Sequence, residues 1–225
     1  MRQRAIVGAQ LSASSLRVLG VDPGTIRTGW GVIERRERAL EFRAAGVIFT
    51  GGFHSLPERL RVIYTGLVAV IDDWVPHVLS LEKAFLAYNV QSAFRLGEAR
   101  GVALLAAAQA GLRIAEYSPT EIKTAVVGYG RAEKSQVQKA VFALLGGGEV
   151  PAALGLPMSR DATDALAAAL CHLNTSRLSE RLQEGGDGRK VMGHGAHGQR
   201  RSLRNVLTKS MVEQLLASER NRGRG

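Results

Sequence analysis

Hydrophobic and polar positions alternate in three early segments of the chain, at residues 16–22, 28–34 and 41–49. Alternation with a period of two is typical of β-strands that bury at least one face. Short turns join these segments, and short connections favour antiparallel pairing of successive strands. The pattern therefore predicts that the first three elements form an antiparallel meander.

The spacing of apolar residues then changes to that of a helix between residues 55 and 73. Ser55 and Glu58 have the spacing of a capping box, which predicts that this helix begins near Ser55. Its apolar residues fall on one face: Leu56, Leu60, Ile63, Leu67, Val70 and Ile71. The same reasoning predicts further helices at 90–110, 118–127, 133–145 and 160–176, and further strands at 77–82 and 112–117.

This order of strands and helices predicts an α/β domain that spans residues 16–177. Residues 1–15 lack a sustained period and are predicted to form a flexible N-terminal extension. Residues 178–225 are predicted to form a basic, Gly-rich flexible tail. A short amphipathic helix is predicted within this tail from four residues spaced by four: Leu203, Leu207, Met211 and Leu215.

Composition narrows the class of protein. The chain has 225 residues, 45% of them hydrophobic, which is enough for one α/β domain with a full core. No apolar run approaches the roughly 20 residues of a membrane span, and the N-terminus lacks the pattern of a signal peptide. The single cysteine, Cys171, excludes an internal disulfide and favours the cytoplasm. The formal charge of +10 favours a polyanionic partner.

Four acids occupy positions that suggest chemistry. Asp22 and Glu82 each end an apolar strand, and Asp161 and Asp164 lie three residues apart at the start of an apolar helix. Residues at this spacing share a helix face. Each acid also has a purely structural interpretation: a turn residue, an exposed strand end, or a helix cap with its first-turn partner.

A joint role requires that these acids converge in the fold. Two like charges about 4 Å apart repel by about 4 kcal/mol at an effective dielectric near 20, and a divalent cation relieves that repulsion. Carboxylate oxygens are the ligands that Mg²⁺ and Mn²⁺ prefer. A pair of such ions can activate water and stabilise the leaving oxygen in phosphodiester cleavage. The four carboxylates therefore form a candidate metal-dependent nuclease site.

The chain also resembles the bacterial crossover-junction endodeoxyribonuclease (RuvC) family across residues 17–176. The similar segments are, in order, VLGVDPGTIRTGWGVIE, LSLEKAFLAYNVQSAFRLGEARGVALLAA, EYSPTEIKTAVVGYGRAEKSQVQ and RDATDALAAALCH. The resemblance implies an RNase H-like fold, with a mixed five-stranded sheet flanked by helices, and a homodimer. It also implies a role in recombination and DNA repair: resolution of four-way Holliday junctions by paired symmetric nicks, with two Mg²⁺ or Mn²⁺ ions per subunit. The RuvA–RuvB branch-migration complex is the implied protein partner.

Carried over residue by residue, the resemblance implies that the metal ligands are Asp22, Glu82, Asp161 and Asp164. The Asp161 position is His in some relatives. The resemblance also implies that Lys123 and Lys134 act in catalysis, through a phosphate or the charge of the transition state. For an isolated lysine, the structural alternative is a solvated helix side chain.

The resemblance places Phe85 at the junction centre, where it would stack on a base pair or disturb it; the structural alternative is a core phenylalanine. Tyr88 stands where relatives often carry a basic residue, which puts a phosphate contact there in doubt. The predicted DNA contacts are Phe85, Lys83, Tyr88, Arg95, Arg100, Lys123, Lys134 and Lys139. His172 is interpreted as a helix-packing residue rather than a ligand.

Two rival functions share some of these features. An actin-like or sugar-kinase ATPase also begins with a strand, an Asp and a glycine turn, but this chain is short for two such lobes and shows no second phosphate loop. A non-catalytic junction-binding protein would use the four acids only as caps. ATP turnover would favour the first, and junction binding without cutting would favour the second.

Overall fold

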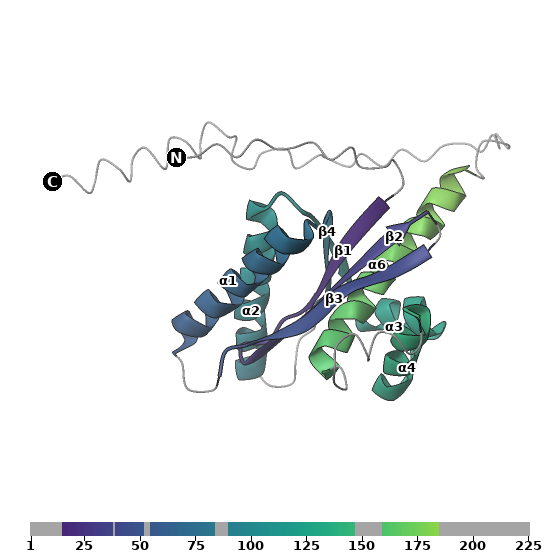
Figure 1. Cartoon of the computed structure of the whole chain (residues 1–225). Helices are drawn as coiled ribbons and strands as arrows, with labels where there is room; N and C mark the ends of the chain where they lie inside the picture. Colours follow the sequence, from purple (N-terminus) through teal and green to yellow (C-terminus); the bar gives the residue numbers. More distant parts are fainter. Residues whose placement is uncertain (1–14, 38, 52–54, 84–89, 147–158, 185–225) are drawn as a thin grey trace, which may run out of the picture. The chain divides into compact units, whose positions relative to one another are not determined.

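The computed structural model describes residues 15–37, 39–51, 55–83, 90–146 and 159–184 (Figure 1). The strands are β1 (Ser15–Asp22), β2 (Arg27–Arg36), β3 (Ala39–Phe49), β4 (Val78–Glu82) and β5 (Arg113–Tyr117). The helices are α1 (Leu56–Trp74), α2 (Val90–Gln109), α3 (Pro119–Val127), α4 (Lys134–Leu144) and α6 (Arg160–Glu184). No helix within these ranges is both long and apolar enough to cross a membrane.

The strands form one mixed sheet in the order β3-β2-β1-β4-β5. The antiparallel pairs β1–β2 and β2–β3 confirm the predicted meander. β4 pairs parallel to β1, and β5 pairs parallel to β4. The carboxyl ends of β1, β4 and β5 therefore lie at the same edge of the sheet, where Asp22 and Glu82 are located.

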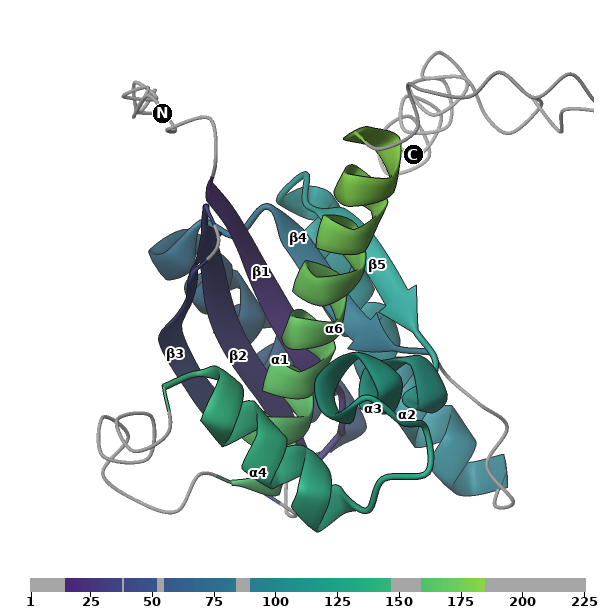
Figure 2. The same cartoon turned by 90° about the vertical axis from the view of Figure 1, so that its right-hand side faces the viewer.

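Helices cover both faces of the sheet, as Figure 2 shows. Leu19 and Val21 of β1 pack with Leu79 and Leu81 of β4 against α1 and α2. On the opposite face, Val18 and other buried side chains pack against α3, α4 and α6. Successive residues of a strand point to opposite faces, so Gly20 and Asp22 follow Val18 onto the α6 face. This α/β/α arrangement confirms the predicted fold class.

Helix α6 lies against a part of the sheet that lacks side chains. A Cβ atom at Gly20 would lie 2.8 Å from the carbonyl carbon of Ala165, and one at Gly29 would lie 2.9 Å from the amide nitrogen of Ala162. A Cβ at Gly31 would meet the Leu166 side chain at 2.5 Å. The three glycines therefore let the helix backbone approach β1 and β2 closely.

Polar contacts fix the position of α6 along its length. The Ser80 hydroxyl donates to the Ala168 carbonyl at 2.7 Å, and the Arg35 guanidinium donates to the Leu173 carbonyl at 3.0 Å. Both donors are buried, so losing these contacts would leave unsatisfied polar groups. The helix can therefore neither slide nor rotate freely against the sheet.

The structure extends one predicted boundary. Helix α6 continues through Glu184, beyond the predicted end at 176. The added sequence, RLSERLQE, contains good helix formers and neither glycine nor proline, which explains the continuation. Residues 1–14 and 185–225 lie outside the described residues, and with them the predicted extension and most of the predicted tail. The proposed domain limits therefore stay predictions.

Adding a methyl group under α6 should destabilise the protein. We expect Gly20→Ala and Gly29→Ala each to lower the free energy of unfolding by about 3 kcal/mol, because the new Cβ meets helix backbone that cannot move aside. Urea denaturation followed by circular dichroism measures the change.

Gly66→Ala is the matched control for this experiment. The nearest atoms to its Cβ would be side-chain atoms of Ile48 rather than helix backbone, with Cδ1 at 2.8 Å and Cγ1 at 2.9 Å, and alanine favours the helical conformation of α1. The expected change is within about 1 kcal/mol. If Gly20→Ala unfolds at the same midpoint urea concentration as the wild type, α6 does not lie so close to the sheet.

Candidate active site

The strand pattern places two of the acids side by side. Val21 of β1 is in register with Leu81 of β4, so Asp22 and Glu82 are the next residues of two neighbouring parallel strands. Both follow side chains that are buried against α1 and α2, so both carboxylates point to the α6 face. A pair of core strands therefore holds the backbones of these two acids about one strand spacing apart, close to 4.8 Å.

The first turns of α6 bring the other two acids. Ser159 caps this helix: its hydroxyl oxygen accepts the Ala162 amide at 3.1 Å. Asp161 is therefore not the N-cap, and its carboxylate is free for other contacts. Asp161 and Asp164 lie three residues apart, on the side of the helix that passes over Gly29 and Gly20.

The convergence of these acids is visible in their electrostatics. Burial, followed by the negative charges of Asp164, Asp161 and Glu82, raises the pKa of Asp22 to about 7. Burial and the charge of Asp164 also raise the pKa of Glu82. Acids far apart in sequence therefore share one site, where their negative charges disfavour one another.

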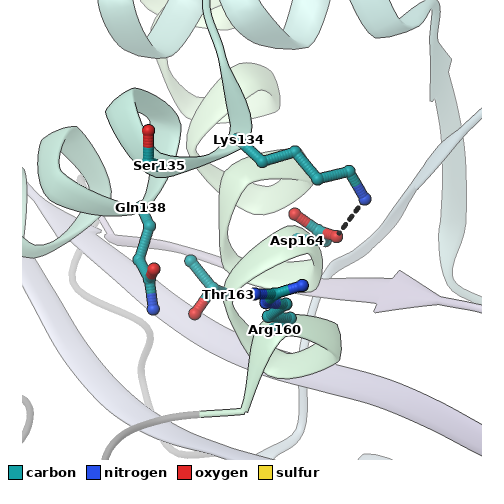
Figure 3. A pocket seen from close by; sticks show the side chains of 6 residues that line it. All are labelled: Lys134, Ser135, Gln138, Arg160, Thr163 and Asp164. Carbon is teal, nitrogen blue, oxygen red and sulfur yellow. Dashed lines mark hydrogen bonds and ion pairs between the residues drawn. The ribbon is translucent and has the colours of Figure 1, made fainter.

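Two basic side chains partly offset this repulsion. Lys134, the first residue of α4, places its Nζ 3.4 Å from Oδ2 of Asp164 (Figure 3). Nε of Arg27, at the start of β2, lies 2.6 Å from Oδ2 of Asp161. Both contacts are solvent-accessible, with the Lys134 side chain 81% exposed and that of Arg27 49% exposed. Exposed ion pairs of this kind are weak and can be exchanged for a stronger partner.

The donor set of the site fits a hard divalent cation, because it consists of carboxylate oxygens and carries excess negative charge. As the side chains stand, no three His, Cys, Asp or Glu residues in the described part of the chain are close enough to enclose an ion. In this arrangement, Lys134 and Arg27 each contact one oxygen of a carboxylate of α6. An ion that binds the same oxygens would compete with these basic groups.

Two cavities open beside the acids. One, of about 300 Å³, contains Asp22, Glu82 and Asp164; its other lining residues are Pro23, Lys83, Leu96, Arg100 and Lys134. The second, of about 220 Å³, shares Glu82, Asp164 and Lys134 with the first and adds Lys123 from α3. Both cavities combine carboxylates with lysines, which suits binding of a phosphodiester near metal ions.

The structure separates the predicted DNA-contact residues into groups. Lys83, Lys123 and Lys134 line the cavities, and Lys83 also pairs with Glu121 at 3.8 Å. Arg95 and Lys139 are exposed on α2 and α4 and line neither of these two cavities. Phe85 and Tyr88 lie outside the described residues.

Arg100 has a different environment from the one expected of a phosphate contact. Its side chain is only 12% exposed and forms an ion pair with Glu116. Its Nη1 also donates to the backbone carbonyl of Glu82 at 2.5 Å. In this structure, the guanidinium therefore supports the end of β4 from α2.

His172 packs between elements, as predicted, and its neighbour Cys171 lies in the core. Nδ1 of His172 lies 2.8 Å from the hydroxyl of Tyr117 on β5, and Cys171 is fully buried. Burial lowers the pKa of His172 and raises that of Tyr117 to about 12, so both groups remain neutral near pH 7. This contact joins α6 to β5 two turns away from Asp164.

Sequence reasoning missed Arg27 and the glycines under α6. Arg27 has the same parity along β2 as Gly29 and Gly31, so the period of two places its side chain on the α6 face. The alternation along β2 could therefore have placed Arg27 on the α6 face, but it could not have identified Asp161 as its partner. The glycines required knowledge of which helix crosses the sheet.

The fold and the site together define a class of enzyme: an RNase H-like nuclease that works with divalent metal ions. Within this class, the chain belongs to the crossover-junction endodeoxyribonuclease RuvC family, whose family model matches residues 18–172. This assignment confirms the resemblance noted in the sequence and the predicted enzyme class, a DNA-cutting hydrolase. It leaves no support for the ATPase or the non-catalytic alternative.

Individual relatives agree with this assignment. The chain is 48% identical over 166 residues to the crossover junction endodeoxyribonuclease RuvC of Magnetococcus marinus, covering 72% of this chain and 87% of that protein. It is 45% identical over 170 residues to that of Trichlorobacter lovleyi, covering 76% and 90%. The structure of Thermus thermophilus RuvC in complex with Holliday junction substrate matches with a TM-score of 0.66 and 29% identity, covering 73% of this chain and 96% of that one.

The raised pKa of Asp22 predicts a specific pH dependence of stability. Between about pH 4 and pH 7, the folded protein retains a proton on Asp22 that the unfolded chain releases, so rising pH destabilises the metal-free fold. We expect Asp22→Asn in EDTA to raise the melting temperature at pH 8 by about 4 °C or more, and to have little effect at pH 4.

Thermal unfolding at both pH values, with and without Mg²⁺, checks this expectation. Mg²⁺ should stabilise the wild type more than Asp22→Asn. Asp73→Asn, an exposed acid of α1, is the control and should give the same small shift under every condition. Equal melting temperatures of wild type and Asp22→Asn at pH 8 in EDTA would contradict the raised pKa.

Proposed function

We propose that this protein resolves Holliday junctions as a homodimer, making paired symmetric nicks with two Mg²⁺ or Mn²⁺ ions bound per subunit. The observation that carries this proposal is the single acid cluster at the ends of β1 and β4, which raises the pKa of Asp22. The relative solved with Holliday junction substrate supports a four-way junction as the DNA. The proposed ligands are Asp22, Glu82 and Asp164, together with Asp161.

In this mechanism, bound ions would supply an activated water and charge stabilisation at the leaving oxygen. The role of the protein is to fix the geometry. Asp22 and Glu82 stand on neighbouring core strands, so their backbones cannot move apart without disrupting the sheet. Such preorganisation avoids a reorganisation cost during the reaction.

Lysines supply positive charge on the open side of the same site. Lys134 contacts Asp164 through an exposed ion pair, and Lys123 of α3 lines the cavity that also contains Glu82. When a phosphodiester enters, each ammonium can donate to a non-bridging oxygen and offset the charge that develops there. We propose this role for both lysines.

A further pocket is lined by residues of α4 and α6 and includes Asp164; Figure 3 shows its lining side chains. Its volume is about 170 Å³. Thr163 also lines it, but its hydroxyl donates to the Ser159 carbonyl at 3.1 Å. The pocket presents hydroxyl, amide and guanidinium groups from Ser135, Gln138 and Arg160. These groups are typical donors to DNA phosphates, so we propose that the cut strand continues here.

Helix α2 supports the proposal of a homodimer. Phe94, Gly97, Gly101 and Leu105 recur at helical spacing and face away from the buried alanines of this helix. Phe94 is 69% exposed and Leu105 is 51% exposed. A Cβ at either glycine would meet nothing within 4 Å, so the glycines do not serve packing on the sheet. We propose that this face binds the same face of a second copy.

Two further proposals rest on the family alone. The RuvA–RuvB branch-migration complex is the proposed protein partner. The cytoplasm is the proposed location, and the single cysteine is compatible with a reducing compartment.

Removing a ligand carboxylate should abolish cutting and preserve binding. We expect Asp164→Asn and Glu82→Gln each to lower the nicking rate by at least about a hundredfold, the scale of losing one electrostatic group in an active site. The assay uses a labelled mobile four-way junction in Mg²⁺, Mn²⁺ or EDTA, with nicks mapped on all four strands.

Asp73→Asn is again the control and should cut at the wild-type rate. Nicks should appear as pairs at symmetric positions in strands of like polarity. A wild-type rate for either ligand variant would remove that residue from the site. Junction binding without any nicking by the wild type, across both metals, would refute the proposed function.

A charge on the α2 face should block dimerisation. We expect Leu105→Arg to convert the dimer to a monomer, because an interface would have to bury an unpaired guanidinium. Analytical ultracentrifugation measures the change. Leu144→Arg, which alters a 40%-exposed leucine of α4, should leave the dimer intact. If Leu105→Arg sediments like the wild type, this face is not the interface.

A further inference from the structure

Arg27 is the basic residue of the site to which neither the sequence pattern nor the mechanism above gives a role. It begins β2, and its Nε lies 2.6 Å from Oδ2 of Asp161. Within the described ranges, Asp161 is its one ion-pair partner. Arg27 therefore links the strand next to β1 to the first turn of α6, directly beside the acid cluster.

The backbone determines this contact. Arg27 and Gly29 point to the same face of β2, and Gly29 lies directly beneath the backbone of Asp161 and Ala162. Ser80 and Arg35 hold this helix on the sheet through its carbonyls. These contacts oppose any movement of α6 that would take Asp161 away from Arg27. A change of partner at Asp161 must come from side-chain movement alone.

The ion pair must compete with a divalent ion. Asp161 contributes to the charge that raises the pKa of Asp22, so its carboxylate lies within electrostatic reach of the other acids. While it pairs with Arg27, one negative charge of the cluster is already neutralised. An ion that takes Oδ2 of Asp161 competes directly with this pair, and the Arg27 side chain is half exposed and free to turn outward.

We infer that Arg27 is an exchangeable counter-ion of the active site. Without metal, it holds Asp161; when a divalent ion takes Asp161, the guanidinium turns to a phosphate of the DNA strand at the site. Arg27 thus weakens metal binding to the free protein and strengthens DNA binding only once metal is present. This inference rests on the proposed metal-dependent function.

The planar guanidinium of Arg27 suits an exchange between a carboxylate and a phosphate. It can form paired hydrogen bonds with either a carboxylate or a phosphate, and it stays charged in both states. Lys134 makes the equivalent contact to Asp164, at the longer distance of 3.4 Å. The two acids of α6 are therefore each paired with one basic group, but the groups come from opposite sides: β2 and α4.

Mn²⁺ binding to the DNA-free, full-length protein tests the first half of the inference. Electron paramagnetic resonance gives the dissociation constant without any need for activity. We expect Arg27→Gln to bind Mn²⁺ up to about fivefold more tightly, which matches the loss of one exposed ion pair. Arg27→Lys, which keeps the charge, should stay near wild type.

The salt dependence of junction binding tests the second half. In Ca²⁺, the slope of log affinity against log salt should be smaller for Arg27→Gln than for wild type by about 1, the value for one phosphate contact. In EDTA, the two slopes should be equal. Arg61→Gln is the control, because it removes the same charge from α1, on the opposite face of the sheet. It should leave the Mn²⁺ affinity unchanged, and it should change the salt slope equally in Ca²⁺ and in EDTA.

The outcomes separate this inference from the proposed function. If wild type and Asp22→Asn bind Mn²⁺ equally, the acid cluster is not the metal site and the proposed function fails. If wild type binds Mn²⁺ at the cluster but Arg27→Gln binds it no more tightly, only the inference is overturned. Equal slope changes in Ca²⁺ and in EDTA would overturn it as well.

Discussion

Close approach of α6 to the sheet is the constraint on which the site depends. Gly20, Gly29 and Gly31 leave β1 and β2 bare, so the helix backbone lies almost on the strands. With ordinary side chains at these positions, α6 would stand further away, and Asp161 and Asp164 would leave the neighbourhood of Asp22. The absence of side chains at these glycines is therefore what brings the two acids of α6 close to Asp22 and Glu82.

This closeness has an electrostatic cost that basic groups reduce. Burial raises the pKa of Asp22, and the neighbouring acids raise it further, so the metal-free site opposes its own ionisation. Lys134 and Arg27 each neutralise one acid of α6 through contacts open to solvent. Weak, exposed pairs suit a site that must exchange partners, since a buried pair would bind too strongly to release its carboxylate.

The strand pattern predicted much of this arrangement. Alternation put Asp22 and Glu82 at the ends of apolar strands, and the spacing of Asp161 and Asp164 put both on one helix face. Nothing in the pattern could show that α6 crosses β1 and β2, because that depends on contacts between segments more than 130 residues apart. The contacts of Arg100 were equally hidden, since a lone arginine in an amphipathic helix gives no sign of the carbonyl it will meet.

These contacts of Arg100 link the proposed dimer interface to the end of β4. One helix, α2, carries the apolar face proposed for the second copy and also the guanidinium that grips the carbonyl of Glu82. Any shift of α2 on association would therefore reach the backbone of Glu82, one of the proposed metal ligands, through the Arg100 contact. The proposed pairing of two copies and the position of Glu82 would then be coupled through one helix.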